Sequence, residues 1–146
     1  MTGEAARSGT TDEARLTGLR TALVLLSVYG LAVGLPAAVV PRRFYDDFPF
    51  VASWVDRLPP YNQHLVSDVG GFYLGFALLF AWAAVRPSRA LVVPLCTAWA
   101  LAAALHFGFH VTHLGGFPTA DAIAQTISLA VVLLLPFAAL ATLRGA

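Results

Sequence analysis

The chain has 146 residues, of which 58% are hydrophobic and 12% charged, with a mean hydropathy of +0.74. This composition excludes an ordinary water-soluble domain, which carries roughly twice that share of charged residues. The net charge is +1, and the nine basic residues are all arginines scattered in ones and twos, so we expect no nucleic-acid-binding surface.

Residues 1–18 mix small, polar and oppositely charged side chains ahead of the first apolar run. Because they cannot bury enough apolar surface to repay ordering, we predict a flexible tail. The apolar run that follows is long enough to cross a bilayer, so we expect a retained helix over 19–40 rather than a cleaved signal peptide. Gly30 and Gly34 within it have the GxxxG spacing typical of close packing against another membrane helix.

Residues 41–63 combine paired arginines, acidic residues, prolines and aromatic residues, which indicates a loop at the membrane interface. We expect a short surface helix in this loop. Its apolar side would carry Phe48, Phe50, Trp54, Val55 and Leu58, and Pro59-Pro60 would end it. Tyr45, Asp46 and Asp47 are interpreted as an exposed acidic turn.

Three more apolar runs predict helices over 64–85, 90–113 and 120–143. Their connecting segments are short, so these helices should be antiparallel neighbours. Gly71 and Gly75 form a second GxxxG pair, which favours packing of the second helix on the first. The predicted fold is therefore an all-α, antiparallel four-helix membrane bundle over residues 19–143, with a short interfacial helix in its first outer loop.

The arginines near the helix ends predict the orientation in the membrane. With the N-terminus inside, six arginines lie on the cytoplasmic side and three on the outer side. The six are Arg7, Arg15, Arg20, Arg86, Arg89 and Arg144; the three are Arg42, Arg43 and Arg57. We therefore expect a multi-pass plasma-membrane protein with both termini cytoplasmic.

Cys96 is the single cysteine and lies in an apolar run. A disulfide within the chain and a thiolate-cluster metal site are both excluded. Cys96 is expected to be a small core residue.

Polar side chains that are unusual in membrane helices are placed toward the predicted outer face of the second, third and fourth helices. Such groups cost about 3 kcal/mol each on insertion scales, so they normally face the bundle interior, pair, or line a wet cavity. Spacings of three and four residues also put several of them on one helix face. They are His64, Asp68, His106, His110, His113, Asp121 and Gln125.

Several interpretations of this polar layer stay open. Its members can form a hydrogen-bonded layer that fixes helix register. His64, Asp68, His106 and His110 have the ligand types of a zinc, copper or iron site, and two histidines can also ligate haem. A His–Asp pair can instead serve acid/base chemistry or the binding of an apolar substrate from the outer leaflet.

The stretches PRRFYDDFP, PPYNQHLVSDVGGFYLG and HFGFHVTH resemble a family of small four-helix membrane proteins of actinobacteria, which is loosely similar to DoxX-type bundles. The resemblance covers most of residues 19–143. It implies a fold and a membrane location, and it brings no activity, cofactor or catalytic residue.

The sequence favours a membrane accessory or ligand-binding protein, with a small membrane enzyme or a metal- or haem-binding protein as the alternative. The expected partners are the lipid bilayer and a second membrane protein or a further copy of the chain, since GxxxG faces serve either packing within the monomer or association.

Overall fold

The computed structural model describes residues 2–58 and 60–143, and its regular secondary structure there is entirely helical. Four of the helices are long and apolar enough to cross a membrane. In chain order the helices are α1 (Thr2–Val39), α2 (Pro41–Asp47), α3 (Gln63–Val85), α4 (Arg89–Thr112) and α5 (Thr119–Thr142).

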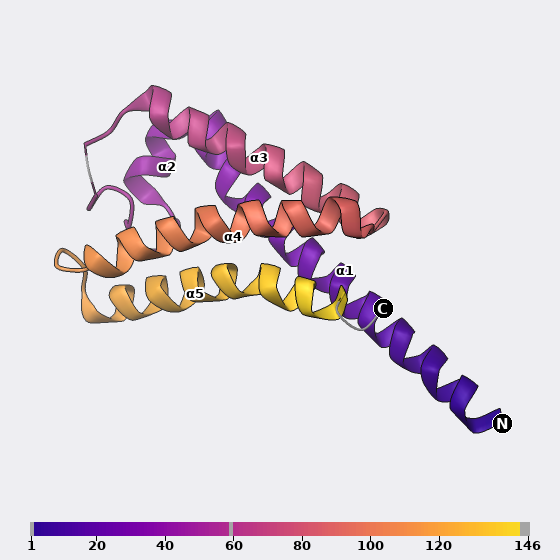
Figure 1. Ribbon diagram of the computed structural model, residues 1–146. Coiled ribbons are helices and arrows are strands. Elements are labelled where there is room, and N and C mark those ends of the chain that lie inside the picture. Colours follow the sequence, from indigo (N-terminus) through magenta and orange to yellow (C-terminus); the bar gives the residue numbers. More distant parts are fainter. Residues whose placement is uncertain (1, 59, 144–146) are drawn as a thin grey trace.

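Helix α1 begins at Thr2, well before the predicted start at Leu19, so the predicted boundary is corrected. Residues such as Glu13, Ala14 and Leu16 favour helix, which explains why helical backbone continues through this polar segment. Residues 9–18 are exposed, and Leu19 is the first buried side chain from residue 9 onward. Figure 1 shows the indigo N-terminal part of α1 projecting beyond the other helices. The apolar run therefore marks where packing begins and not where the helix begins.

The short helix also lies elsewhere than predicted. Helix α2 occupies 41–47, and residues 48–58 form turns and bends instead of a surface helix. Pro41 suits the first helical turn, and Arg42–Asp46 and Arg43–Asp47 pair one turn apart at 2.7 and 3.6 Å. The predicted acidic turn is thus the paired end of a helix.

The other three helices begin and end within one residue of their predicted bounds. Side-chain oxygens cap two of them, since Asn62 accepts from the Leu65 amide at 3.1 Å and Ser88 accepts from the Leu91 amide at 3.3 Å. These caps satisfy backbone donors that a helix start would otherwise leave unpaired. The short connection predicted between the second and third long helices is confirmed, since only residues 86–88 separate α3 from α4.

Helices α1 and α3 lie side by side, as the glycine spacing predicted. A Cβ atom on Gly30 would lie 3.0 Å from the Cβ of Ala77, and one on Gly34 would lie 2.9 Å from the Leu74 amide nitrogen. The Ser27 hydroxyl donates to the Ala77 carbonyl across the same contact at 2.9 Å. The missing side chains on α1 therefore allow the two backbones to approach closely.

The α3 side of this contact is formed by Gly70 and not by Gly71 and Gly75, so that part of the packing prediction is wrong. A Cβ on Gly70 would collide with the Ala38 backbone, whereas one on Gly71 or Gly75 would meet nothing within 4 Å. Gly71 follows Gly70 by one residue and lies about 100° further around the helix, which turns it away from α1.

The core is packed unevenly along the helices. Near the α3–α4 turn, side chains of α1, α3, α4 and α5 form one buried cluster that includes Leu23, Phe80, Cys96 and Trp99, and Cys96 is fully buried as expected. From this turn, α3 and α4 diverge toward the end of the molecule that carries α2 and the α4–α5 turn (Figure 1). We call this the α2 end, and it is where the candidate site lies.

Candidate functional site

A cavity of about 370 Å³ lies at the α2 end and is lined by all five helices and the segment that follows α2. We call residues 48–58 the covering segment, because several of its side chains enclose the cavity. The volume falls within the range of small-molecule sites. The lining residues are mostly apolar or aromatic; those used below are Tyr29, Tyr73, Trp54, His106, His110, Gln125 and Leu129.

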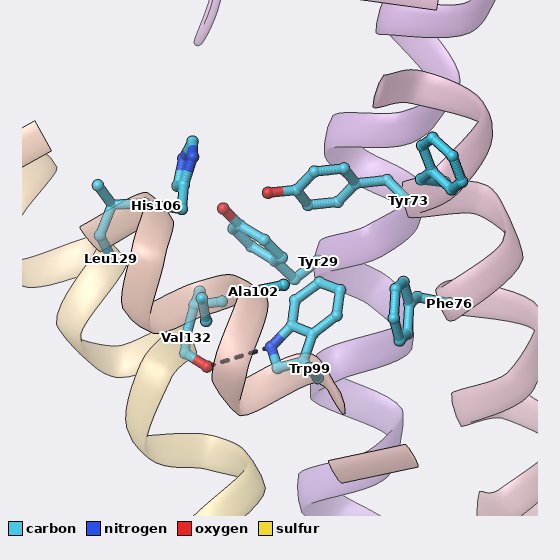
Figure 2. Close-up of a pocket in the computed structure, with 10 residues that line it drawn as sticks. Tyr29, Tyr73, Phe76, Trp99, Ala102, His106, Leu129 and Val132 are labelled. Atoms are coloured by element: carbon cyan, nitrogen blue, oxygen red, sulfur yellow. Dashed lines mark hydrogen bonds between the residues drawn. The ribbon is translucent and has the colours of Figure 1, made fainter. Parts of the chain in front are cut away.

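A smaller cavity of about 210 Å³ shares Tyr29, Tyr73, His106 and Leu129 with the larger one. Its remaining lining is apolar and aromatic and includes Trp99, whose indole N–H donates to the Val132 carbonyl at 3.4 Å (Figure 2). Because four residues line both spaces, we treat them as two parts of one site. Both parts are mostly apolar, and Trp54, His110 and Gln125 line only the larger one.

Four aromatic rings from α1 and α3 pack edge-on against Trp99, at centroid distances of 5.2 to 6.2 Å. Edge-to-face contacts of this kind favour one arrangement of the rings. The wall between the smaller cavity and the core is therefore built from mutually supported rings.

Among the residues that the structure describes, three buried side-chain polar atoms have no hydrogen-bond partner: Trp54 Nε1, His110 Nδ1 and Gln125 Oε1. They come from the covering segment, α4 and α5, and all three residues line the larger cavity. Gln125 is only 3% exposed. Leaving a buried donor or acceptor unpaired costs about 1–3 kcal/mol, so three such atoms around one cavity are unexpected unless something occupies it.

The histidines of α4 bring further polar atoms to the site. The rings of His106 and His110 lie edge-to-face with centroids 4.5 Å apart, and the His110 side chain lies beside that of Gln125. Figure 2 shows the hydroxyl groups of Tyr29 and Tyr73 and the His106 ring facing a common space. The polar groups of the site therefore come from α1, α3, α4 and α5.

The covering segment is bound to the turn between α4 and α5 by Arg57. Its guanidinium donates to the Gly116 carbonyl at 2.9 Å and to the Ser53 carbonyl at 2.8 Å, and it lies over the Phe117 ring. The Trp54 amide also donates to the Phe48 carbonyl at 2.9 Å, which fixes a turn inside the segment. These bonds hold Trp54 against the cavity.

The smaller cavity reaches the side of the molecule. Phe72 of α3 and His106 of α4 both line it and are both exposed, Phe72 to 72%. Large apolar side chains are exposed beside them, for example Leu105. The opening thus lies between α3 and α4, on the apolar lateral surface rather than at an end.

The structure separates the predicted polar layer into smaller groups. His64 and Asp68 pair with each other at 2.9 Å, with side chains 86% and 52% exposed, and they line neither cavity. His113 Nδ1 is bonded to the Phe109 carbonyl at 2.8 Å at the end of α4. Asp121 is half-buried at the start of α5 and also lines neither cavity.

The predicted four-residue metal set is therefore divided into two pairs, His64 with Asp68 and His106 with His110. Across residues 2–58 and 60–143, no three His, Cys, Asp or Glu side chains are grouped as metal ligands would be. Helical spacing predicted contacts within α3 and within α4 correctly, but it holds no information on the distance between helices that diverge.

Reasoning from charge and metal-ligand spacing missed the tyrosines and Trp54 as polar groups of the site. Tyr29 and Tyr73 stand inside long apolar runs, and a hydroxyl there needs a partner just as an imidazole does, so they were a usable signal. Gln125 belongs to the predicted polar layer and is its most buried member.

Protein-family models, curated proteins and solved structures were all compared with the chain, and none of them matches it. The resemblance to small actinobacterial membrane proteins stays a prediction, and the site is interpreted from its own geometry.

Proposed function

We propose that this chain is an integral membrane protein that binds an amphipathic small molecule in the cavity at its α2 end. The four long apolar helices would cross the bilayer as an antiparallel bundle with both termini in the cytoplasm. The arginine distribution supports this orientation, which puts the α2 end and its cavity at the outer leaflet.

The observation that carries the proposal is the meeting of Trp54 Nε1, His110 Nδ1 and Gln125 Oε1 on one largely apolar cavity. An apolar space with a few convergent polar groups is the usual form of a small-molecule site. Three elements supply the three atoms; His110 and Gln125 are neighbours that interact with each other, so Trp54 Nε1 is the atom that most needs an outside partner.

Ordered water is the competing occupant, since water molecules commonly satisfy buried polar atoms. Water would satisfy the three atoms without using the apolar remainder of the cavity or the side opening at Phe72. An amphipathic ligand accounts for both parts of the site, with a polar head at the unpaired atoms and an apolar body toward α3.

The test uses brominated twelve-carbon chains, because bromine quenches tryptophan fluorescence on contact. The protein is placed in phosphatidylcholine nanodiscs with Trp82, which is exposed on α3, replaced by Phe. Trp54 and Trp99 then report on the site. At least one of bromododecane, ω-bromododecanol and ω-bromododecanoate should quench saturably as its mole fraction in the lipid rises.

A matched pair of variants locates the binding. Leu129→Phe fills a position that lines both cavities and should abolish the saturable quenching. Ile127→Phe, on the exposed side of the same helix, should leave it intact. Thermal unfolding of both variants checks folding. Quenching that is linear for every chain, or equally saturable in Leu129→Phe, would contradict ligand binding in the cavity.

A further inference from the structure

We infer that the ligand of this site is an uncharged amphiphile whose head is a hydroxyl group, such as a long-chain or isoprenoid alcohol or an acylglycerol. The inference rests on the proposed function and adds the chemical class of the ligand. Three features of the site support it: the donor and acceptor character of the unpaired atoms, the lack of charged side chains in the lining, and the direction of the apolar space.

The unpaired atoms suit a head that both accepts and donates. The Trp54 indole N–H only donates, and the Gln125 carbonyl oxygen only accepts. His110 Nδ1 does either, according to its tautomer. A hydroxyl group supplies a donor and two acceptor lone pairs on one atom, whereas a ketone, an ester or a quinone supplies acceptors alone.

The lining also excludes a permanently charged head. The larger cavity is lined by neither Arg nor Lys, nor by any Asp or Glu. Arg57, on the covering segment, is bonded to carbonyl oxygens and does not line the cavity. A carboxylate, phosphate or ammonium would therefore be buried without an opposite charge, which costs far more than burying a hydroxyl.

The apolar part of the site shows where the chain of such a molecule would lie. Tyr29, Tyr73, His106 and Leu129 join the larger cavity to the smaller aromatic one, which opens between α3 and α4 at Phe72. In a bilayer this lateral surface faces acyl chains. A lipid alcohol would thus enter from the membrane, with its chain past Phe72 and its hydroxyl at Gln125.

The head group is tested with four twelve-carbon probes in the Trp82→Phe nanodiscs: ω-bromododecanol, the ω-bromo methyl ketone, bromododecane, and ω-bromododecanoate at alkaline pH. Affinities are compared as mole fractions in the lipid, which removes differences in partitioning. The alcohol should bind about 5- to 10-fold more tightly than the ketone, the amount expected from one additional hydrogen bond of average strength, and more tightly still than the hydrocarbon, which makes none. The ionised carboxylate should bind most weakly.

The two glutamines of the chain give a matched variant pair. Gln125→Leu removes the acceptor and should lower the affinity for the alcohol by about 5- to 10-fold. The affinity for the hydrocarbon should stay the same or rise. Gln63→Leu, at the exposed start of α3, should change neither affinity. Trp54→Phe would remove one reporter, so its effect is measured through the remaining Trp99.

The outcomes separate the ligand class from the site itself. Saturable binding in which the ketone, the hydrocarbon or the carboxylate equals the alcohol would overturn the hydroxyl class and leave the proposed site standing. An alcohol affinity unaffected by Gln125→Leu would also overturn it. Absence of saturable binding for all four probes would instead reject the site.

Discussion

Glycines close together in α3 have different structural roles. Gly70 lies against the Ala38 backbone of α1, whereas Gly71 and Gly75 point into open space. In open space a glycine only weakens a helix, by about 1 kcal/mol relative to alanine. At a backbone contact, an added methyl group forces the two helices apart.

Alanine substitutions should therefore act in opposite directions. We expect Gly70→Ala to lower the free energy of unfolding by about 1–3 kcal/mol, the usual range for overpacking. Gly71→Ala and Gly75→Ala should be neutral or raise it by up to about 1 kcal/mol. Denaturant unfolding in mixed micelles measures all three. A loss of stability in Gly75→Ala as large as that in Gly70→Ala would contradict this assignment of the contact.

The histidines also act as separate groups. His64 contacts Asp68 on an exposed face of α3, and His106 contacts His110 beside the cavity. Residues that share no partner have additive effects on stability, whereas residues in contact generally do not.

A pair of double-mutant cycles tests this separation. Asp68→Asn and His106→Ala should add within about 0.5 kcal/mol, while His106→Ala and His110→Ala should deviate from additivity by more than that. Unfolding free energies of the single and double variants give both coupling terms. Strong coupling between Asp68 and His106 would restore the single polar layer that helical spacing suggested.

At the scale of elements, the covering segment is attached to the α4–α5 turn mainly through one side chain. The Arg57 guanidinium donates a hydrogen bond to the Gly116 carbonyl and packs over the Phe117 ring. Removing the guanidinium would remove both interactions. The turn inside the segment does not depend on it, because the Trp54 amide bonds the Phe48 carbonyl.

We therefore expect Arg57→Gln to increase amide hydrogen exchange across residues 48–58 without changing the exchange of α3 or α5. Local opening with few remaining contacts requires less free energy than global unfolding. Hydrogen exchange with mass spectrometry measures the effect. Arg43→Gln, which removes an exposed pair with Asp47, is the control. Equal exchange in both variants would show that Arg57 does not hold the segment.

The elements themselves could largely be predicted from the sequence. Apolar runs predicted α3, α4 and α5 within one residue, because this signal is local. The short helix was misplaced because the aromatic residues of 48–58 suggested a helix face, while Pro41 and the i, i+4 ion pairs at 41–47 favoured the earlier position. Local helix signals outweighed apolar content.

At the scale of the whole molecule, the cavity results from uneven packing that no local pattern shows. Side chains fill the space near the α3–α4 turn, and the same helices diverge toward the α2 end, where the covering segment takes the place of a further packed helix turn. His106, His110 and Gln125 could be named from sequence as polar residues in apolar runs. Their separation from His64 and Asp68 could not be predicted from the sequence, because it depends on how far α3 and α4 diverge.

The proposed orientation makes a prediction for intact cells. Because Cys96 is fully buried, introduced cysteines can be labelled without background from it. A membrane-impermeant maleimide should label Ser53→Cys in the covering segment and should not label Ser88→Cys at the α3–α4 turn. Labelling after lysis shows that both sites react. The reverse pattern would invert the molecule and place the cavity at the cytoplasmic leaflet.

The most direct measurement on the cavity is the indole N–H signal of Trp54, in protein labelled with ¹⁵N-tryptophan and placed in nanodiscs. The chain has three tryptophans, so three signals are expected, and Trp54→Phe assigns the relevant one. Because Trp54 Nε1 has no partner in the structure whereas Trp99 already donates to Val132, dodecanol should move the Trp54 proton downfield saturably and leave Trp82 and Trp99 nearly unchanged. A Trp54 signal that does not move, or moves only as much as that of the exposed Trp82, would contradict ligand binding at this site.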